Sequence, residues 1–198
     1  MKIFDLSQPV FGCRVYPGDP APQRTLLTSI PNGDPCNLTA FSMCAHNGTH
    51  VDAPSHFIHG ATPVGNLPLS TFVGWAFVAQ HRGGIVTATD AAQILQRAAH
   101  SNPQAAARIL LKGNVQVSLQ AAKVFASSGM LLLGNEPQTV GPPAEPSAVH
   151  LALLSANVAL LEGICLDAVT EGTYFLSAAP LNLGDADGAP CRAILIAD

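Results

Sequence analysis

Short apolar runs recur along the whole chain, and polar, proline or glycine residues separate them. Most of these runs have the length of a β-strand rather than of a helix, and the run at 108–111 predicts a buried strand. The strands predicted from the pattern span residues 3–6, 38–45, 75–79, 84–86, 108–111, 130–133, 158–163, 173–176, 181–183 and 193–197.

Three segments between these runs carry helix signals instead. Each has small or apolar residues at helical spacing behind a residue that can cap a helix. The predicted helices are 91–99 behind Thr89 and Asp90, 118–126 beginning at Ser118, and 148–154 behind Ser147. Because helices alternate with strands, the pattern predicts an α/β fold.

Proline and glycine keep the connecting segments irregular. Residues 9–22 form a loop with turns, and Pro142, Pro143 and Pro146 force another loop before the last predicted helix. Residues 184–188 form a turn between the last two predicted strands.

The densest polar segment is residues 46–57, H-N-G-T-H-V-D-A-P-S-H-F, which holds three of the seven histidines. If the segment is extended around His50 and Asp52, both side chains point to the same face, because side chains alternate along a strand. Gly48 argues against a helix and favours a turn that brings His46 to the same centre. Three polar groups can therefore share one ligand.

Pro54 favours extended geometry at Ala53, so His56 leaves the strand at a set angle and arrives beside this cluster. Imidazole and carboxylate together suit zinc, manganese or iron, whereas calcium and magnesium prefer oxygen ligands. The alternative is that these are ordinary loop or core histidines, each bonded to the backbone. The density of ligand types in one segment favours the metal site.

Composition fits one soluble domain spanning residues 1–198. A chain of this length buries roughly 70% of its unfolded surface in one core. Hydrophobic residues make up 48% of the chain and charged residues 11%, so we expect apolar surface that a partner subunit covers. The net charge of −4 comes without a basic run, which argues against nucleic acid as a partner.

The five cysteines are widely spaced and include no C-x-x-C, which argues against a disulfide framework. The N-terminal apolar run contains Asp5 and no cleavage motif follows it, while no segment approaches the apolar length of a membrane span. We expect a cytoplasmic protein that does not bind membranes.

The segment from His46 to His56 matches H-x-G-T-H-x-D-x-P-x-H at every fixed position. It resembles the signature of the metal-dependent cyclase family, which includes the bacterial kynurenine formamidases. The similarity extends from Asp5-Leu6-Ser7-Gln8-Pro9 to the terminal strands. It implies the family's single-domain α/β fold, of the swivelling β/β/α type, with a β-rich layered core, packed helices and commonly a homodimer.

In bacterial kynurenine formamidases a histidine and a glutamate twelve positions apart complete the metal site, and His150 and Glu162 match that spacing. Without the resemblance, the first is an ordinary helix histidine and the second a strand-end acid. The metal ligands implied by the family are His46, His50, Asp52, His150 and Glu162. The family further implies two divalent ions, zinc first and manganese as the alternative, bridged by Asp52 and Glu162. His46 and His150 then lie towards one ion and His50 towards the other.

The same resemblance implies that His56 stays off the metals and acts as the catalytic proton shuttle. Tyr16 begins Y-P-G-D where the formamidases have W-P-G-D, so it is the predicted substrate-binding aromatic, although Pro17-Gly18-Asp19 alone predicts only a tight turn. Glu136 keeps an acid that the family carries near the active site, but the residues after it differ.

The implied activity is that of a metal-dependent amidohydrolase acting on a non-peptide C–N bond of a small aromatic substrate. Arylformamidase activity, which converts N-formylkynurenine to kynurenine and formate, is the leading interpretation. One alternative is a lactone or isatin-type ring-opening hydrolase, or a cyclase, with the same ligands. Another is a metal-binding protein without turnover.

Overall fold

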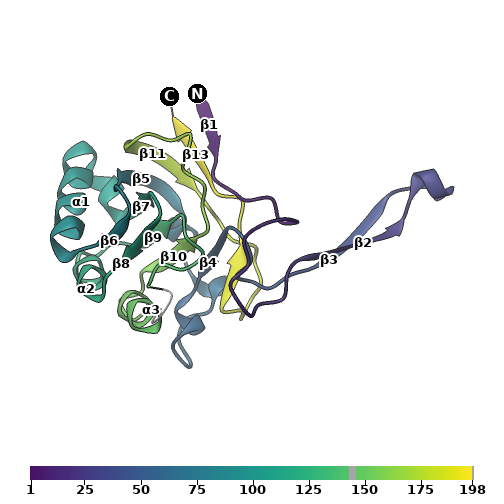
Figure 1. The fold of residues 1–198 in the computed structure, drawn as a ribbon, viewed down its shortest axis with the longest axis horizontal. Coiled ribbons are helices and arrows are strands. Elements are labelled where there is room, and N and C mark those ends of the chain that lie inside the picture. The colour runs from purple at the N-terminus through teal and green to yellow at the C-terminus, as the bar shows by residue number, and fades with distance from the viewer. Residues whose placement is uncertain (143–145, 198) are drawn as a thin grey trace.

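The computed structural model of the chain describes residues 1–142 and 146–197. A mixed, curled sheet of nine strands forms its centre (Figure 1). In spatial order the strands are β1 (Lys2–Asp5), β13 (Ile194–Ala197), β11 (Gly172–Ser177), β5 (Val73–Gln80), β7 (Arg108–Lys112), β9 (Leu132–Asn135), β10 (Ala159–Glu162), β4 (His50–Asp52) and β12 (Gly188–Pro190).

The four central strands, β5, β7, β9 and β10, pair in parallel, and the strands at both flanks pair antiparallel. Parallel neighbours need crossover connections, and the helices α1 (Ala88–Ser101), α2 (Leu119–Ser127) and α3 (Ser147–Leu154) lie in these connections. All three pack on one face of the sheet and share a core with it (Figure 1).

A second buried cluster fills the opposite face, where Leu6, Val51 and Phe72 pack with residues of the flanking strands. The connecting segments contain short 3₁₀ turns, which are η1 (Ile30–Asn32), η2 (Pro54–His56), η3 (Val64–Asn66), η4 (Leu69–Thr71) and η5 (Pro103–Ala107). No helix in the described part of the chain is long and apolar enough to cross a membrane.

Two small sheets complete the fold. The strands β6 (Gly84–Val86) and β8 (Val115–Val117) form a parallel pair, and β2 (Gln23–Thr28) and β3 (Leu38–Ser42) form an antiparallel pair. The second pair extends away from the body as a long hairpin, which we call the arm, residues 23–42 (Figure 1).

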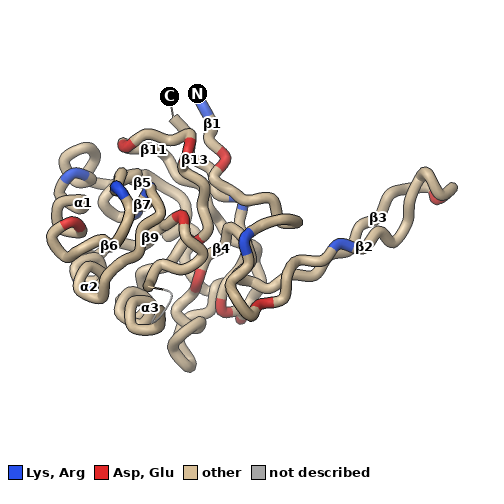
Figure 2. Tube along the Cα trace, viewed as in Figure 1, with Lys and Arg blue, Asp and Glu red and all other residues tan. Residues whose placement is uncertain are grey.

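The arm exposes apolar side chains to an unusual degree. Leu27 is 56% exposed and Phe41 is 59% exposed, and Leu26, Ile30 and Leu38 are similar. Arg24 and Asp34 are its only charged residues, so the arm is nearly free of charge along its length (Figure 2). An isolated two-stranded hairpin is at best marginally stable in water, and contiguous exposed apolar surface marks an interaction site.

The α/β class, the three helices and most of the predicted strands are confirmed. The helix α1 begins earlier than predicted, because Thr87 accepts the N–H of Asp90 and Asp90 in turn accepts the N–H of Thr87. The cap predicted at Ser147 is wrong, because α3 starts at Ser147 with no side-chain cap. Pro143 of the predicted proline loop lies outside the described residues.

Two predicted strands differ from the structure. Residues 38–45 were expected to deliver the histidine segment to the central sheet, but β3 pairs with β2 in the arm. Residues 181–183 form no strand, and β12 instead begins at Gly188, the last residue of the predicted turn. A strand pattern gives no information about its partner, because pairing depends on the tertiary context.

Candidate metal centre

The histidine segment is fixed by a tight turn and by side chains from distant loops. Gly48 has a φ of +63°, and a Cβ there would lie 2.8 Å from the Cβ of Cys13, so both conformation and space favour glycine. The hydroxyl of Thr49 donates to the Gly163 carbonyl at 2.8 Å. The amide of Gln138 donates to the carbonyls of Gly48, at 2.7 Å, and His46, at 3.0 Å. The turn is therefore held from outside.

The register of the sheet brings two more groups to the same face. His50 and Asp52 alternate along β4 as predicted, and both are buried. In the antiparallel pairing of β4 with β10, Glu162 lies directly opposite His50. Residues directly opposite each other project to the same face, so the three side chains meet over the sheet.

The orientation of two imidazoles is set by backbone carbonyls. His50 Nδ1 lies 3.0 Å from the Gly48 carbonyl, and His150 Nδ1, on α3, lies 2.9 Å from the Pro146 carbonyl. A carbonyl only accepts hydrogen bonds, so Nδ1 carries the proton in both rings. In the neutral rings, the free lone pair of each Nε2 therefore points away from these carbonyls.

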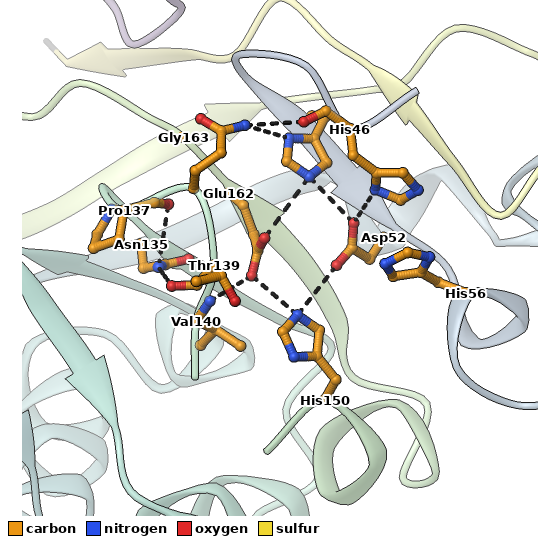
Figure 3. Close-up of polar contacts among 12 residues, drawn as sticks. His46, Asp52, His56, Asn135, Pro137, Thr139, Val140, His150, Glu162 and Gly163 are labelled. Carbon is orange, nitrogen blue, oxygen red and sulfur yellow. Dashed lines mark hydrogen bonds and ion pairs between the residues drawn. The ribbon is translucent and has the colours of Figure 1, made fainter. Parts of the chain in front are cut away.

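The Nε2 atom of His150 faces the two buried carboxylates of Asp52 and Glu162 (Figure 3), and the Nε2 atom of His50 faces the same pair. His50 Nε2 lies 3.3 Å from Asp52 Oδ1 and 3.7 Å from Glu162 Oε2. His150 Nε2 lies 3.6 Å from Asp52 Oδ2 and 3.4 Å from Glu162 Oε1. Ligands about 2.0–2.2 Å from a tetrahedral zinc ion stand roughly 3.3–3.6 Å apart. The spacing is consistent with a metal site, and each carboxylate spans the same two imidazoles.

An unsatisfied oxygen indicates the same fit. Asp52 Oδ2 is buried without a hydrogen-bond partner among the described residues. The other buried carboxylate differs, because Glu162 Oε1 accepts the backbone N–H of Val140 at 2.6 Å. A buried carboxylate oxygen without a partner is costly, and a divalent cation would satisfy it. The donor set of imidazole and carboxylate suits zinc or manganese.

The pKa values of the carboxyl groups are separated by their surroundings. Burial alone would raise the pKa of Asp52, but its hydrogen bonds to His46 and His50 outweigh burial and hold that pKa well below its usual range. Burial and the charge of Asp52 together raise the pKa of Glu162. Asp52 is thus the permanent anion of the pair.

His46 lies between two carboxylates. Its Nδ1 is 2.8 Å from Asp52 Oδ1, and its Nε2 is 3.0 Å from Asp187 Oδ2. Burial opposes protonation, but the hydrogen bonds and charges of the two acids outweigh it and raise the pKa of His46 to about 9. A metal ion that binds here displaces this proton. His46 and His50 both face Asp52 Oδ1, whereas His150 faces Asp52 Oδ2. This arrangement differs from the expectation that His46 and His150 lie towards the same ion.

His56 arrives beside the cluster, as Pro54 predicts. Its ring stacks on that of His46, with centroids 4.0 Å apart, and its Nδ1 lies 3.0 Å from Asp187 Oδ2. Burial lowers the pKa of His56, and the charge of His46 lowers it further, so the ring is neutral at pH 7 despite the nearby acids. Ligand atoms of His46, Asp52 and His56 also lie within 4.8 Å of one another.

A cavity of about 270 Å³ lies over these groups. Tyr16, the predicted substrate-binding aromatic, is part of its wall, and Phe57 stacks on His150 with ring centroids 4.5 Å apart. The cavity is lined by Tyr16, Asp19, Cys44, His46, His50, Asp52, His56, Phe57, Gln138, Thr139, Pro146, His150 and Glu162.

Glu136 is not among the lining residues. Its carboxylate accepts the backbone N–H groups of Gly113, at 2.6 Å, and Leu166, at 2.9 Å, so it holds two loops together. Conversely, Gln138 and Asp187 contact residues of the histidine segment, but no sequence pattern predicted these contacts. A glutamine after a strand and an aspartate in a Gly-Asp turn are common in loops.

The fold and the site together define a class: a mixed α/β protein whose small cavity lies over a buried cluster of imidazoles and carboxylates suited to divalent metal. The chain belongs to the Cyclase family, because the family model described as "Putative cyclase" matches residues 4–141.

Individual relatives agree with this assignment. A protein named kynurenine formamidase from Erythrobacter litoralis is 30% identical over 204 residues, which cover 98% of this chain and 93% of the relative. A solved structure described as "Potential Metal-Dependent Hydrolase With Cyclase Activity" is also 30% identical, with a TM-score of 0.81 and coverage of 98% of this chain and 96% of that one. An isatin hydrolase structure is 17% identical with a TM-score of 0.83, covers 100% of this chain and 93% of that one, and shows the fold alone.

Proposed function

We propose that this protein is a metal-dependent hydrolase of a small amide, and that its substrate is an N-formyl aromatic amine such as N-formylkynurenine. The observation that carries the proposal is the set of buried ligands under a cavity, with the ring of His56 stacked on that of His46 beside it. The relatives named kynurenine formamidase support the narrower claim.

Two divalent ions fit the ligands, with zinc expected first and manganese as the alternative. Asp52 and Glu162 would help to hold both ions, because each presents its two oxygens to two different imidazoles. His46, His50 and His150 would complete the site. When bound, such ions polarise a carbonyl and make water acidic enough to ionise near pH 7.

The side chains around the cavity supply the remaining steps. His56 Nδ1 is engaged by Asp187, so Nε2 is the atom that takes a proton from the attacking water and returns it to the leaving nitrogen. Tyr16 and Phe57 provide flat, apolar contact for an aromatic ring. No arginine or lysine lines the described cavity, which favours a weakly charged substrate over a phosphate.

Steady-state hydrolysis of N-formylkynurenine by the zinc-loaded protein tests the narrower claim. We expect kcat/KM above roughly 10⁴ M⁻¹s⁻¹, the lower end for native substrates. A value below roughly 10³ M⁻¹s⁻¹ contradicts arylformamidase activity. Other formanilides, isatin and small lactones form the comparison panel. Hydrolysis of one of these would leave a cyclase-family hydrolase with another substrate, and no turnover on any would contradict the hydrolase.

We further propose a homodimer in which the partner covers the arm. The pairing of Arg24 with Phe41 and of Leu26 with Thr39 places Leu26 and Phe41 on one face of the hairpin. Both are about half exposed, and Arg24, which projects from the same face opposite Phe41, is the only basic residue of the arm. Such a face is typical of an interface between subunits.

Replacing both Leu26 and Phe41 by Glu is expected to convert the dimer into a monomer of 20.5 kDa. Dimer formation would then bury two carboxylates in an apolar interface, which is costly. Light scattering coupled to size exclusion measures the mass. The control is Leu69→Glu, at a residue 66% exposed outside the arm, which should leave the dimer intact. A monomeric wild-type protein, or a double variant that remains dimeric, contradicts the proposal.

A further inference from the structure

One carboxylate oxygen joins the metal centre to the proposed proton shuttle. Asp187 Oδ2 lies 3.0 Å from His46 Nε2 and 3.0 Å from His56 Nδ1, and the two rings stack face to face. A carboxylate accepts hydrogen bonds, so both nitrogens donate to it. Neither ring can turn without losing this bond.

The position of Asp187 is fixed independently of these two bonds. Its backbone carbonyl accepts the N–H of Ala53 at 2.9 Å, and β12 begins at the next residue, pairing Gly188 with Asp52. A Cβ at Gly188 would lie 2.6 Å from His46 Cε1, so glycine is needed for the ring to pack there. The chain thus brings the aspartate to this place through the backbone, and the side-chain contacts follow.

Each hydrogen bond selects one tautomer. When His56 Nδ1 carries the proton, Nε2 has the free lone pair that a general base needs. Without metal, His46 Nδ1 donates to Asp52 Oδ1 at 2.8 Å. When a metal ion displaces that proton, Nε2 keeps its own proton through Asp187, and the Nδ1 lone pair is left on the side of Asp52, where a metal ligand is required. A carboxylate that accepts from the second nitrogen of a metal-binding histidine orients the ring and raises its basicity.

We propose that Asp187 is a positioning residue that fixes the tautomers of His46 and His56 together, and so couples metal retention to proton transfer. This inference rests on the proposed hydrolase function for its kinetic part only. Asp187 does not line the cavity, and it acts through the two imidazoles.

The kinetic test uses Asp187→Ala and Asp187→Asn in zinc-saturated protein. We expect Ala to lower kcat by about 10- to 100-fold with little change in KM, the scale for a lost carboxylate behind a functional histidine. Asn keeps one acceptor oxygen, and its amide nitrogen can occupy the other, solvent-facing position, because the Asp187 side chain is 48% exposed. It should therefore recover part of the loss. The matched control, Asp185→Ala, removes an exposed acid from the same turn and should match wild type.

A double-variant cycle separates the effect of Asp187 on His56 from its effect on His46. In protein that already carries His56→Ala, Asp187→Ala should cause no further loss of kcat, because there is no shuttle left to position. Zinc affinity, measured by competition with a chelator, should fall about 10-fold in both backgrounds, since His46 is present in each. Equal kcat losses in both backgrounds contradict the role towards His56, and unchanged zinc affinity contradicts the role towards His46.

A readout that needs no substrate keeps this inference distinct from the proposed function. Nitrogen NMR of the histidine side chains in zinc-loaded protein reports which ring nitrogen carries a proton. We expect His56 to be protonated at Nδ1 in the wild type and in Asp185→Ala, and to shift towards Nε2 protonation in Asp187→Ala. A wild-type ring protonated at Nε2 overturns the inference, whatever the protein hydrolyses.

Discussion

Replacing Asp52 by Asn is expected to strip the centre of metal and to lower turnover on the best substrate by about 10³-fold. Each oxygen of Asp52 faces a different imidazole, and Asp52 Oδ1 also contacts His46, so this carboxylate touches three of the expected histidine ligands whereas Glu162 touches two. An amide oxygen carries no charge, and its nitrogen would meet His50 or His150 as a donor. The polarisation that a metal supplies is worth several kcal/mol, and about 1.4 kcal/mol is a factor of ten in rate.

Elemental analysis of protein purified without chelators measures this effect. The wild type should contain zinc or manganese approaching two ions per chain, because its five candidate ligands exceed the three that hold a single catalytic zinc. Asp52→Asn should contain less than half of that amount. Thermal unfolding of the metal-free forms checks the fold, because removing one partner of a buried ion pair destabilises a protein by about 3–5 kcal/mol. Asp185→Asn, an exposed acid, is the control. Full metal content with full turnover in Asp52→Asn would contradict the assignment of this carboxylate.

Replacing His56 by Ala is expected to lower turnover by roughly 100-fold or more while the metal stays bound. This is the scale of a removed general base, and His56 is neutral near pH 7 because burial lowers its pKa. The only side-chain hydrogen bond of His56 among the described residues goes to Asp187, so the remaining ring nitrogen is free for proton transfer.

Metal content and kcat of the same preparation distinguish two roles for His56. His46, Asp52 and His56 lie close enough to share an ion, so loss of metal in His56→Ala would make His56 a ligand and contradict the shuttle. The control is His59→Ala, an exposed histidine three positions later that does not line the cavity. It should keep both metal and turnover.

The local part of the site could be predicted from the sequence because it depends on local geometry. His50 and Asp52 share a face through the alternation of a strand, and Gly48 and Pro54 bring their neighbours to it. His150 and Glu162 have no such signal, since a helix and the register of β4 with β10 bring them to the centre. Only the family resemblance pointed to them.

The parts that could not be predicted depend on pairing between distant segments. The pattern of residues 38–45 predicts a strand correctly, but the partner of β3 is β2, and the result is an arm instead of a central strand. Asp187 reaches the histidines only because β12 pairs with β4. An aspartate that precedes a glycine in a turn has the same local pattern whether or not it contacts a site.

The pairing of β12 with β4 also sets when the centre is completed during folding. Asp187 and His46 are separated by 141 positions along the chain, and His150 and Glu162 also join from beyond the middle of the sequence. Contacts between remote segments close large loops and form slowly. The centre is therefore complete only after the C-terminal strands have paired with β4. A ribosome synthesises the chain from its N-terminus, and the early histidines therefore emerge long before their partners. Nascent chains thus pass through a period in which His46 and His56 lack the aspartate that later fixes them.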